Sequence, residues 1–532
     1  MRVLGIEGTA WAASAALYDT DAERIVVESN PYQPDSGGIH PREAAEHMGD
    51  AVPEVVETVL AEARETADAD PPIDAVAFSR GPGLGPCLRI VATAARSLAA
   101  TLSLPLVGVN HMVAHLEIGR HRSGFDSPVC LNASGANAHL LGYRDGRYRV
   151  LGETMDTGVG NALDKFTRHV GWTHPGGPKV ESAAEDGAYV DLPYVVKGMD
   201  FSFSGITSAA KETYDDGVAV EDVCFSLQEN VFAMLTEVAE RALSLTGTDE
   251  LVLGGGVGQN DRLRAMLAEM CAARGAEFYA PEPRFLRDNA GMIAVLGAKM
   301  YEAGDTLAVA DSAVDPNFRP DEVPVTWRGD DESVVRLGDP GTEVQGAEAV
   351  VSLEPDRVVK RRRPKSYRHP DLDARLRRER TVAEARLTSE ARRHGVPTPV
   401  VSDVDVADST LVFERVGDAD LAAALTPARA RRVGEHLATL HGAGVVHGDP
   451  TTRNVRVHRD DDAVFLIDFG LGYHSRHVED HAMDLHVFAG SVVGTADDPD
   501  AVLDAVEAGY AAVGDDAVLS RLRDVEDRGR YR

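Results

Sequence analysis

The sequence predicts an α/β first part followed by a smaller α+β second part. Three observations lead to this fold class. The chain has 532 residues, which is too long for one ordinary domain. Its first 325 residues alternate short apolar segments with glycine turns and helical stretches, as α/β folds do. Residues 326–342 are polar and rich in Asp and Gly, and the pattern changes beyond them. We therefore predict domains at 1–325 and 343–532, joined by a linker at 326–342.

In the first part, five apolar segments each run into a turn that contains glycine. They span residues 1–10, 73–85, 104–112, 128–143 and 250–260. Small residues after a strand let the backbone approach an anionic ligand closely. Three of these turns, at residues 5–10, 132–137 and 253–260, suit a two-lobed cleft that holds an adenylate. The alternative is that all three are ordinary turns.

The second part begins with two β-like stretches within residues 350–363. A long charged helix is expected over 372–395, and short strands and helices follow it. This mixture favours an α+β domain rather than a continuation of the first fold.

The composition points to a soluble cytoplasmic protein adapted to high salt. Asp and Glu total 86 against 54 Lys and Arg, which gives a formal net charge of -32, and only seven residues are lysine. An acidic, lysine-poor surface keeps a protein hydrated in a salty cytosol. At molar salt the Debye length is about 3 Å, so the net charge does not argue against a nucleic-acid partner. The N-terminus has no signal-peptide layout, and we expect no membrane association.

The four cysteines are scattered without CxxC spacing, so neither a disulfide framework nor a thiolate zinc site is predicted.

Two histidines predict a metal centre in the first part. His111 and His115 share one face if the segment is helical, so both imidazoles can reach one ion. Asp288 precedes an apolar helix and can complete a His-His-Asp set, which suits iron or zinc with open positions. Met112 stands where a zinc protease has its glutamate, so peptide hydrolysis is not expected.

The second part carries the residue set of a protein kinase. Asp449 and Asn454 keep the Asp-x4-Asn spacing of a catalytic loop, and Asp468 opens an Asp-Phe-Gly sequence. Lys360 follows a β-like stretch, as a phosphate-pairing lysine does, and either Glu384 or Glu379 could pair with it. An unusual nucleotide-covering loop is expected at Gly346, Ala347, Glu348 and Ala349.

The HMVAH segment at 111–115, the three glycine loops and the run at 160–181 resemble the universal tRNA N6-adenosine threonylcarbamoyltransferase family. The resemblance covers residues 1–325 and implies the two-lobed fold of actin, Hsp70 and sugar kinases. It also implies transfer of the threonylcarbamoyl group from threonylcarbamoyl-AMP to N6 of the adenosine beside the anticodon (position 37). The substrates are tRNAs that read codons beginning with A.

The same resemblance implies the site residues. His111, His115 and Asp288 match ligands of a metal usually assigned as Fe2+, with zinc as an alternative. The residues that match substrate contacts are Asn132, Ala133, Ser134, Gly135 and Ala136 for the acyl-phosphate end, and Asp164, Gly177, Glu181 and Asn260 for the adenosine and ribose.

Three residues depart from the pattern of that family. Archaeal and eukaryotic relatives commonly have a tyrosine metal ligand at the position of Asn132, which leaves the fourth ligand open. Ala136 and Ala138 replace a glycine and a threonine of the usual loop.

The second part resembles the small kinase of the KEOPS tRNA-modification assembly, which is related to p53-related protein kinase. The basic run at 360–370 is close to the signature of that family. The resemblance implies ATP with Mg2+, a catalytic Asp449, nucleotide contacts at Lys360, Asn454 and Asp468, and other KEOPS subunits as partners. ATP hydrolysis and serine/threonine phosphorylation both stay open.

Two other functions are compatible with parts of this pattern. A sugar-kinase-like or chaperone-like ATPase with a regulatory kinase would keep the fold but would not need His111 or His115. A scaffold with a vestigial kinase would not need the set Lys360, Asp449 and Asp468, which is complete here.

Overall fold

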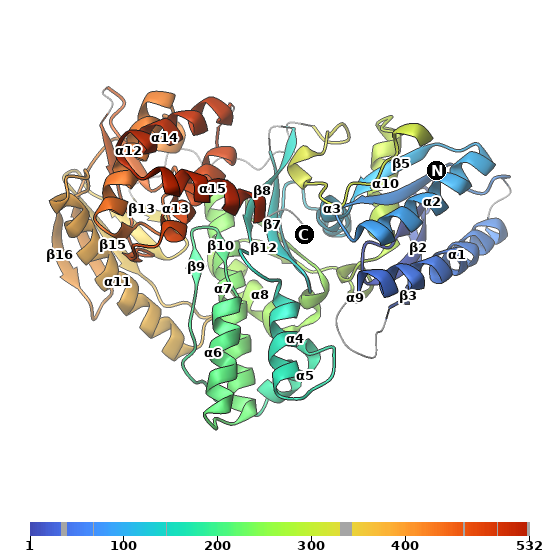
Figure 1. The fold of residues 1–532 in the computed structure, drawn as a ribbon, viewed down its shortest axis with the longest axis horizontal. Coiled ribbons are helices and arrows are strands. Elements are labelled where there is room, and N and C mark those ends of the chain that lie inside the picture. The colour runs from blue at the N-terminus through green and yellow to red at the C-terminus, as the bar shows by residue number, and fades with distance from the viewer. Residues whose placement is uncertain are drawn as a thin grey trace.

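The computed structural model describes residues 1–32, 40–66, 69–144, 146–329, 343–460, 463–496 and 498–528. Three blocks lie in a row along the longest axis of the molecule (Figure 1). We call them the first lobe (strands β1–β5 and their helices), the second lobe (strands β6–β12 and their helices) and the C-terminal part (residues 343–528). The second lobe lies in the middle.

The first lobe is built on a five-stranded sheet in the order β3-β2-β1-β4-β5. The first three strands pair antiparallel, whereas β4 and β5 run parallel to β1. The strands are β1 (Arg2–Glu7), β2 (Ala12–Asp19), β3 (Arg24–Pro31), β4 (Ala75–Gly81) and β5 (Leu106–Asn110). Helices α1 (Pro41–Glu65) and α2 (Gly85–Leu102) cover one face, and α3 (His111–Ser123) and α10 (Ala290–Glu302) cover the other.

The second lobe repeats this arrangement. Its main sheet has the order β12-β11-β6-β7-β8, which is the same succession of one meander and two parallel strands. The strands are β6 (Val129–Ala133), β7 (Ala138–Arg144), β8 (Arg147–Glu153), β11 (Glu250–Gly254) and β12 (Glu277–Tyr279), and the helices are α4 (Val159–His169), α5 (Gly177–Ala184), α6 (Ser204–Asp215), α7 (Val220–Thr246) and α8 (Asp261–Arg274). Strands form in all five apolar segments predicted from the sequence, so that prediction is confirmed.

Helix α3 lies between the two lobes. A single apolar core surrounds it, and this core includes residues of both main sheets, for example Ala77 of β4 and Val252 of β11. Every residue of α3 from Val113 to Gly119 is buried, which is typical of a helix packed on all sides. A side chain at Gly119 would collide with Val252. The position of α3 is therefore fixed by both lobes at once.

The C-terminal part is α+β, as predicted. Its antiparallel sheet has the order β13-β14-β15-β17-β16 and carries one long helix, α11 (Pro370–Arg393). The strands are β13 (Glu343–Gln345), β14 (Ala349–Leu353), β15 (Arg357–Arg362), β16 (Val401–Asp405) and β17 (Thr410–Glu414). A helical region with short strand pairs follows, formed by α12 (Pro427–Gly442), α13 (Val478–Val493), α14 (Pro499–Val513), α15 (Asp516–Arg528), β18 (Ala419–Asp420), β19 (Val445–Val446), β20 (Val455–Val457), β21 (Val464–Leu466) and β22 (Tyr473–His474).

Several elements of the second lobe contact the C-terminal part. Helix α7 presents the buried Glu237 and Glu240 and the half-buried Arg241 to it. The hairpin of β9 (Val196–Lys197) and β10 (Asp200–Phe201) reaches its Asp-x4-Asn loop. Of the predicted linker, residues 330–342 lie outside the described residues. Residue Arg328 is buried against Glu117 of α3, so this end of the segment packs on the first two lobes.

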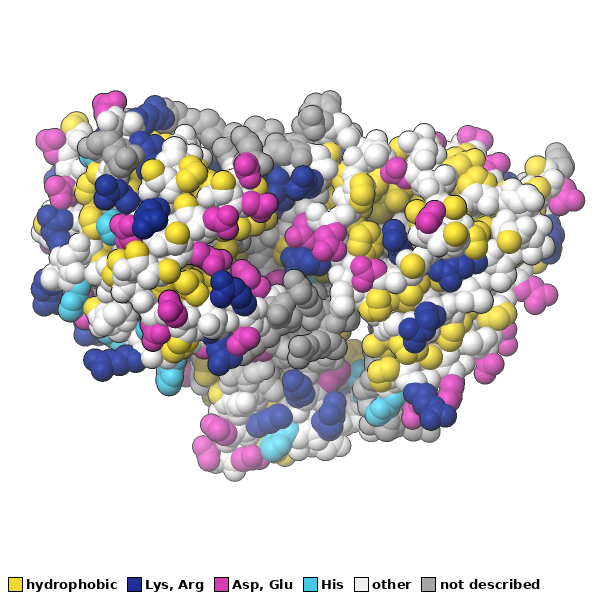
Figure 2. Space-filling view, turned by 45° about the horizontal axis from the view of Figure 1, so that its top comes forward, with side chains coloured by type: hydrophobic (Ala, Val, Ile, Leu, Met, Phe, Trp, Pro, Cys, Tyr) yellow, Lys and Arg dark blue, Asp and Glu magenta, His cyan; other side chains and the backbone are white. Residues whose placement is uncertain are grey.

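Acidic side chains are spread over the face of the molecule drawn in Figure 2, with lysine and arginine between them. Within the described ranges, no helix combines the length and the apolar character that crossing a bilayer requires.

Candidate metal centre and kinase-like site

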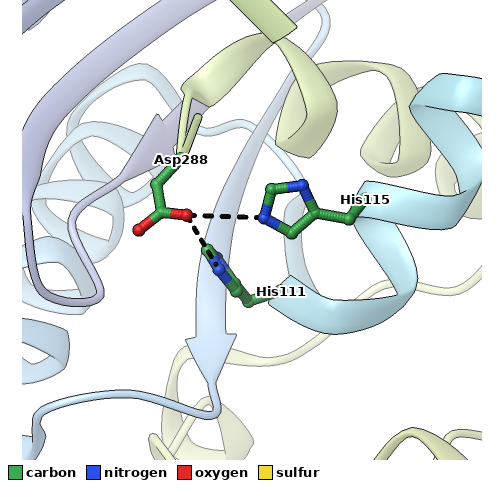
Figure 3. A group of neighbouring side chains, drawn as sticks. All are labelled: His111, His115 and Asp288. Atoms are coloured by element: carbon green, nitrogen blue, oxygen red, sulfur yellow. Dashed lines mark ion pairs between the residues drawn. The ribbon is translucent and has the colours of Figure 1, made fainter. Parts of the chain in front are cut away.

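His111, His115 and Asp288 come together as predicted (Figure 3). The Nε2 atoms of both histidines lie 3.4 Å from the same oxygen, Oδ1 of Asp288. One candidate ligand atom from each residue lies within 4.8 Å of the others. Ligands about 2.1 Å from one ion are separated by about 3.4–4.2 Å, so small side-chain adjustments suffice for all three to hold one cation. Two imidazoles and one carboxylate fit iron or zinc and leave positions open.

Helix α3 starts at the first of these histidines because Asn110 caps it. The side-chain oxygen of Asn110 accepts hydrogen bonds from the backbone N–H groups of Met112 and Val113, which fixes the entry of the helix. The two histidines then lie one turn apart on the same face.

Glu7, at the end of β1, orients the first histidine. Its Oε2 lies 3.2 Å from Nδ1 of His111, and the carboxylate is fully buried. This leaves Nε2 of His111 facing Asp288, the carboxylate–histidine arrangement common at metal sites. Burial lowers the pKa of His111, but Glu7 and Asp288 outweigh it and raise that pKa to about 10. The negative charges of Glu7 and Asp288 would also attract a metal cation, which has to displace this proton because a ligating imidazole is deprotonated.

The loops of the second lobe border this centre. Asn132 is the last residue but one of β6, and its Oδ1 lies 3.6 Å from the point where a Cβ on Gly254 would stand. The Cβ of His115 lies at the same distance from that point. The glycine turns after β6 and β11 therefore meet beside the predicted ligands, as a shared site requires.

The predicted acyl-phosphate loop is held against the start of α4. The backbone N–H of Gly160 donates to the carbonyl of Ser134, and that of Asn161 donates to the carbonyl of Gly135. A side chain at Gly158 would collide with Ala136 and the backbone beside it. This tight packing fixes the backbone of the loop from Asn132 through Ala133 to Ala136.

The residues predicted to contact the adenosine lie on helices α4 and α5 and at the start of helix α8. Asp164 of α4 accepts a hydrogen bond from the N–H of Gly176, next to Gly177 at the start of α5. Glu181 of α5 accepts from the N–H of Asp261 at the start of α8. Asn260 caps that helix, so its oxygen is already used by the backbone. The structure thus brings these four residues into one region of the second lobe.

The kinase residues are assembled in the C-terminal part. Nζ of Lys360 lies 2.9 Å from Glu384 and 2.6 Å from Asp468, so the ion pair forms with Glu384 and not with its rival Glu379. Burial raises the pKa of Asp468, but Lys360 and Arg362 lower it to about 2. An ionised carboxylate at this position is ready to hold a metal ion.

The predicted catalytic base is fixed by its own loop. Nδ2 of Asn454 donates to Oδ2 of Asp449 over 3.0 Å. Asp484 of α13 accepts from the backbone N–H groups of His447 and Gly448, at 2.7 and 2.8 Å. These bonds hold the Asp-x4-Asn loop in place.

Residues of the second lobe cover this base. Nη1 of Arg241 lies 2.8 Å from Oδ2 of Asp449, and the backbone N–H of Gly198 donates to the carbonyl of Gly448. A Cβ on Gly198 would stand 3.3 Å from Oδ1 of Asp449. Burial raises the pKa of Asp449 to about 7, although Arg241 lowers it.

The expected nucleotide-covering loop is a tight turn between β13 and β14. The N–H of Gly346 donates to the carbonyl of Ala349, and Ala347 lies between them. Glu348 pairs with Arg241 at 2.7 Å and also with Arg380 of α11. Its carboxylate therefore belongs to the contact between the second lobe and the C-terminal part.

Sequence reasoning missed Glu7, Arg241 and Asp484. Glu7 stands inside the first glycine loop, and that loop was a weak indication of a functional site. Nothing near Arg241 in the sequence marks it, because its partners in the C-terminal part, Glu348 and Asp449, lie more than a hundred residues away.

Two lobes that repeat one topology, with a His-His-Asp centre between them and a kinase-like part attached, define an actin/Hsp70-like metal-binding transferase fused to a small kinase. Residues 22–295 match the profile of the family described as "tRNA N6-adenosine threonylcarbamoyltransferase". The chain belongs to this family, a metal-dependent family of transferases, and the predicted membership and fold class are confirmed.

Relatives match over the full length, including the kinase-like part. The chain is 71% identical over 100% of both chains to a "Probable bifunctional tRNA threonylcarbamoyladenosine biosynthesis protein" of Haloquadratum walsbyi. A protein of the same name from Methanocorpusculum labreanum is 50% identical, over 100% of this chain and 99% of the relative. The bifunctional name agrees with the two-part architecture.

Proposed function

We propose that the chain transfers the threonylcarbamoyl group from threonylcarbamoyl-AMP to N6 of the adenosine beside the anticodon, in tRNAs that read codons beginning with A. The observation that carries this proposal is the convergence of His111, His115 and Asp288 beside the glycine turns of the second lobe. Neither an ATPase of sugar-kinase type nor a scaffold requires such a set.

In this proposal, His111, His115 and Asp288 hold the metal, and Glu7 orients His111. Iron is our assignment, with zinc as the alternative. When bound, the metal supplies Lewis-acid stabilisation to substrate oxygens. The loop at 132–136 binds the acyl-phosphate end, and Asp164, Gly177, Glu181 and Asn260 bind the adenosine. The tRNA amine is the nucleophile, so the protein acts chiefly by positioning and charge stabilisation.

We further propose that the C-terminal part hydrolyses ATP with Mg2+ and thereby drives the cycle of a KEOPS-like assembly in the cytoplasm. Lys360, Asn454 and Asp468 bind the nucleotide and its metal, with Asp449 as the base. Arg241 and Gly198 cover Asp449, which favours a small nucleophile such as water over a protein hydroxyl. Residues 1–325 and 343–532 are the two catalytic domains, and 326–342 is the linker between them.

The test is mass spectrometry of tRNA nucleosides after incubation with threonine, bicarbonate, ATP and the adenylate-forming partner enzyme. Wild type yields the modified nucleoside, and the double variant His111→Ala/His115→Ala yields none while it retains the fold by circular dichroism. The matched control is His121→Gln, further along α3. Unchanged modification by the double variant would remove the metal from the mechanism. For the C-terminal part, Asp449→Ala stops ATP hydrolysis by the full chain, and persistent turnover would identify another base.

A further inference from the structure

Two neighbouring side chains near the metal centre carry buried polar atoms that nothing in the described structure satisfies. They are Oδ1 of Asn132 and both ring nitrogens of His139. Asn132 is 4% exposed and His139 is 1% exposed. An unsatisfied buried polar group costs about 1–3 kcal/mol, so three such atoms in one place indicate that a polar ligand normally lies there.

The two side chains share one face of the second lobe's sheet. Asn132 of β6 and His139 of β7 are directly opposite each other in the antiparallel pair, and residues opposite each other project from the same face. That face is directed at the metal centre, because Oδ1 of Asn132 and the Cβ of His115 both lie 3.6 Å from the position that a Cβ on Gly254 would occupy. The nitrogens of His115 are also without hydrogen-bond partners among the described residues.

The imidazole of His139 is neutral in this environment. Burial and the charges of His115 and His111 together lower its pKa to about 3. A neutral imidazole has one N–H donor and one acceptor nitrogen. It can therefore hold a water molecule or a substrate oxygen from either side.

His139 is not placed as a direct ligand. Within the described residues, the ligand atoms that lie within 4.8 Å of one another come from His111, His115 and Asp288 alone. A further molecule must then bridge the pair Asn132 and His139 to the metal that His111, His115 and Asp288 would hold. Buried water commonly fills this role and makes about three hydrogen bonds to groups that are otherwise unsatisfied.

We infer that Asn132 and His139 are positioning residues of the metal centre: together they would hydrogen-bond a water molecule that takes an open position on the metal when it is bound. This inference rests on the metal site of the proposed function.

The test uses the full chain and Co2+ as the probe, because its visible d–d bands report coordination. Competition with a chelator gives the affinity. We expect His139→Leu to bind Co2+ about 10–100-fold more weakly, as loss of outer-shell partners does, with altered d–d bands. His139→Gln, which can still hydrogen-bond to water, should stay within a few fold of wild type. The matched control His121→Gln, whose ring packs on Tyr18, should leave affinity and spectrum unchanged.

Thermal unfolding of the metal-free protein separates binding from folding. His139→Leu removes an unsatisfied imidazole, so it should unfold at or above the wild-type temperature without metal. If it fails to fold, Asn132→Val is the second variant, with the same loss of affinity and change of spectrum expected.

Wild-type affinity and an unchanged spectrum in a folded His139→Leu or Asn132→Val protein would overturn the inference and leave the proposed function intact. In contrast, Co2+ binding that survives in His111→Ala/His115→Ala would remove the metal site itself, and both proposals would fail together.

Discussion

Nη1 of Arg241 lies 2.8 Å from Oδ2 of Asp449, although the two residues are 208 positions apart. Arg241 comes from α7 of the second lobe, and Asp449 is the predicted base of the kinase-like part. The same guanidinium contacts Glu348 and Glu237. One helix of the second lobe thus supplies a charge to the kinase-like site, and the two halves of the chain share an electrostatic contact.

The first prediction concerns this contact. Arg241 holds the pKa of Asp449 down against burial, which raises it to about 7. ATP hydrolysis needs the ionised carboxylate, so Arg241→Met should move the acidic limb of the pH–rate profile upward by about one pH unit or more. Arg241→Lys keeps a positive charge and should stay near wild type. Superimposable profiles of Arg241→Met and wild type would mean that Arg241 does not act on the base.

The second prediction concerns Glu7. Replacing its carboxylate by an amide weakens the hold on Nδ1 of His111, so Glu7→Gln should lower the metal affinity about 10–100-fold. Equilibrium dialysis followed by metal analysis measures this change. Glu28→Gln is the matched control, because Glu28 is exposed on strand β3 of the same sheet. Equal metal content in Glu7→Gln and wild type at limiting metal would contradict the role.

The third prediction concerns the buried charge of Glu117 on α3. Its carboxylate lies 2.7 Å from Lys299 and 3.1 Å from Arg328, and both Glu117 and Arg328 have fully buried side chains. Glu117→Gln removes the buried carboxylate charge that faces both Lys299 and Arg328, which should cost about 3–5 kcal/mol in the free energy of unfolding. Denaturant unfolding measures it. Arg120→Gln, which removes a longer contact of 3.4 Å to the same carboxylate, should cost less, and an equal loss in both variants would contradict the assignment.

The fourth prediction concerns two neighbouring carboxyls, the half-buried Glu153 and the buried Asp200. Burial raises the pKa of each to about 7, and the charge of Asp200 adds to the effect on Glu153. Between about pH 4 and pH 7 the folded state then binds more protons than the unfolded state, so stability falls as pH rises through this window, by up to about 1.4 kcal/mol per pH unit for each group. Two neighbouring groups, His486 of α13 and Arg319, also face the pair, and their positive charges lower the pKa of Glu153.

Asp200→Asn should flatten that dependence, because it removes one titrating group and lowers the pKa of Glu153. Thermal unfolding at several pH values across the window measures the slope. Asp216→Asn, at an exposed position after α6, is the control and should keep the wild-type slope. A wild-type slope in Asp200→Asn would show that the carboxyls are ionised throughout.

Local patterns predicted much of the fold and part of the site. The five strand–glycine segments and the long helix α11 follow from local sequence patterns and turn residues, which act over a few neighbouring positions. His111 and His115 could be placed on one face only on the condition that their segment is helical. The spacing from Asp449 to Asn454 is likewise contained within a single loop.

The sequence by itself determined the two-part architecture, the elements and the side chains that belong to one helix or one loop, because those depend on residues close together along the chain. Only the tertiary structure decided that Glu7 contacts His111 and that Arg241 covers Asp449. It also decided that Oδ1 of Asn132 and the ring nitrogens of His139 lie beside the candidate metal centre without a hydrogen-bond partner among the described residues. Each of these contacts joins elements that packing between lobes brings together, and no local periodicity encodes which buried charge will face which.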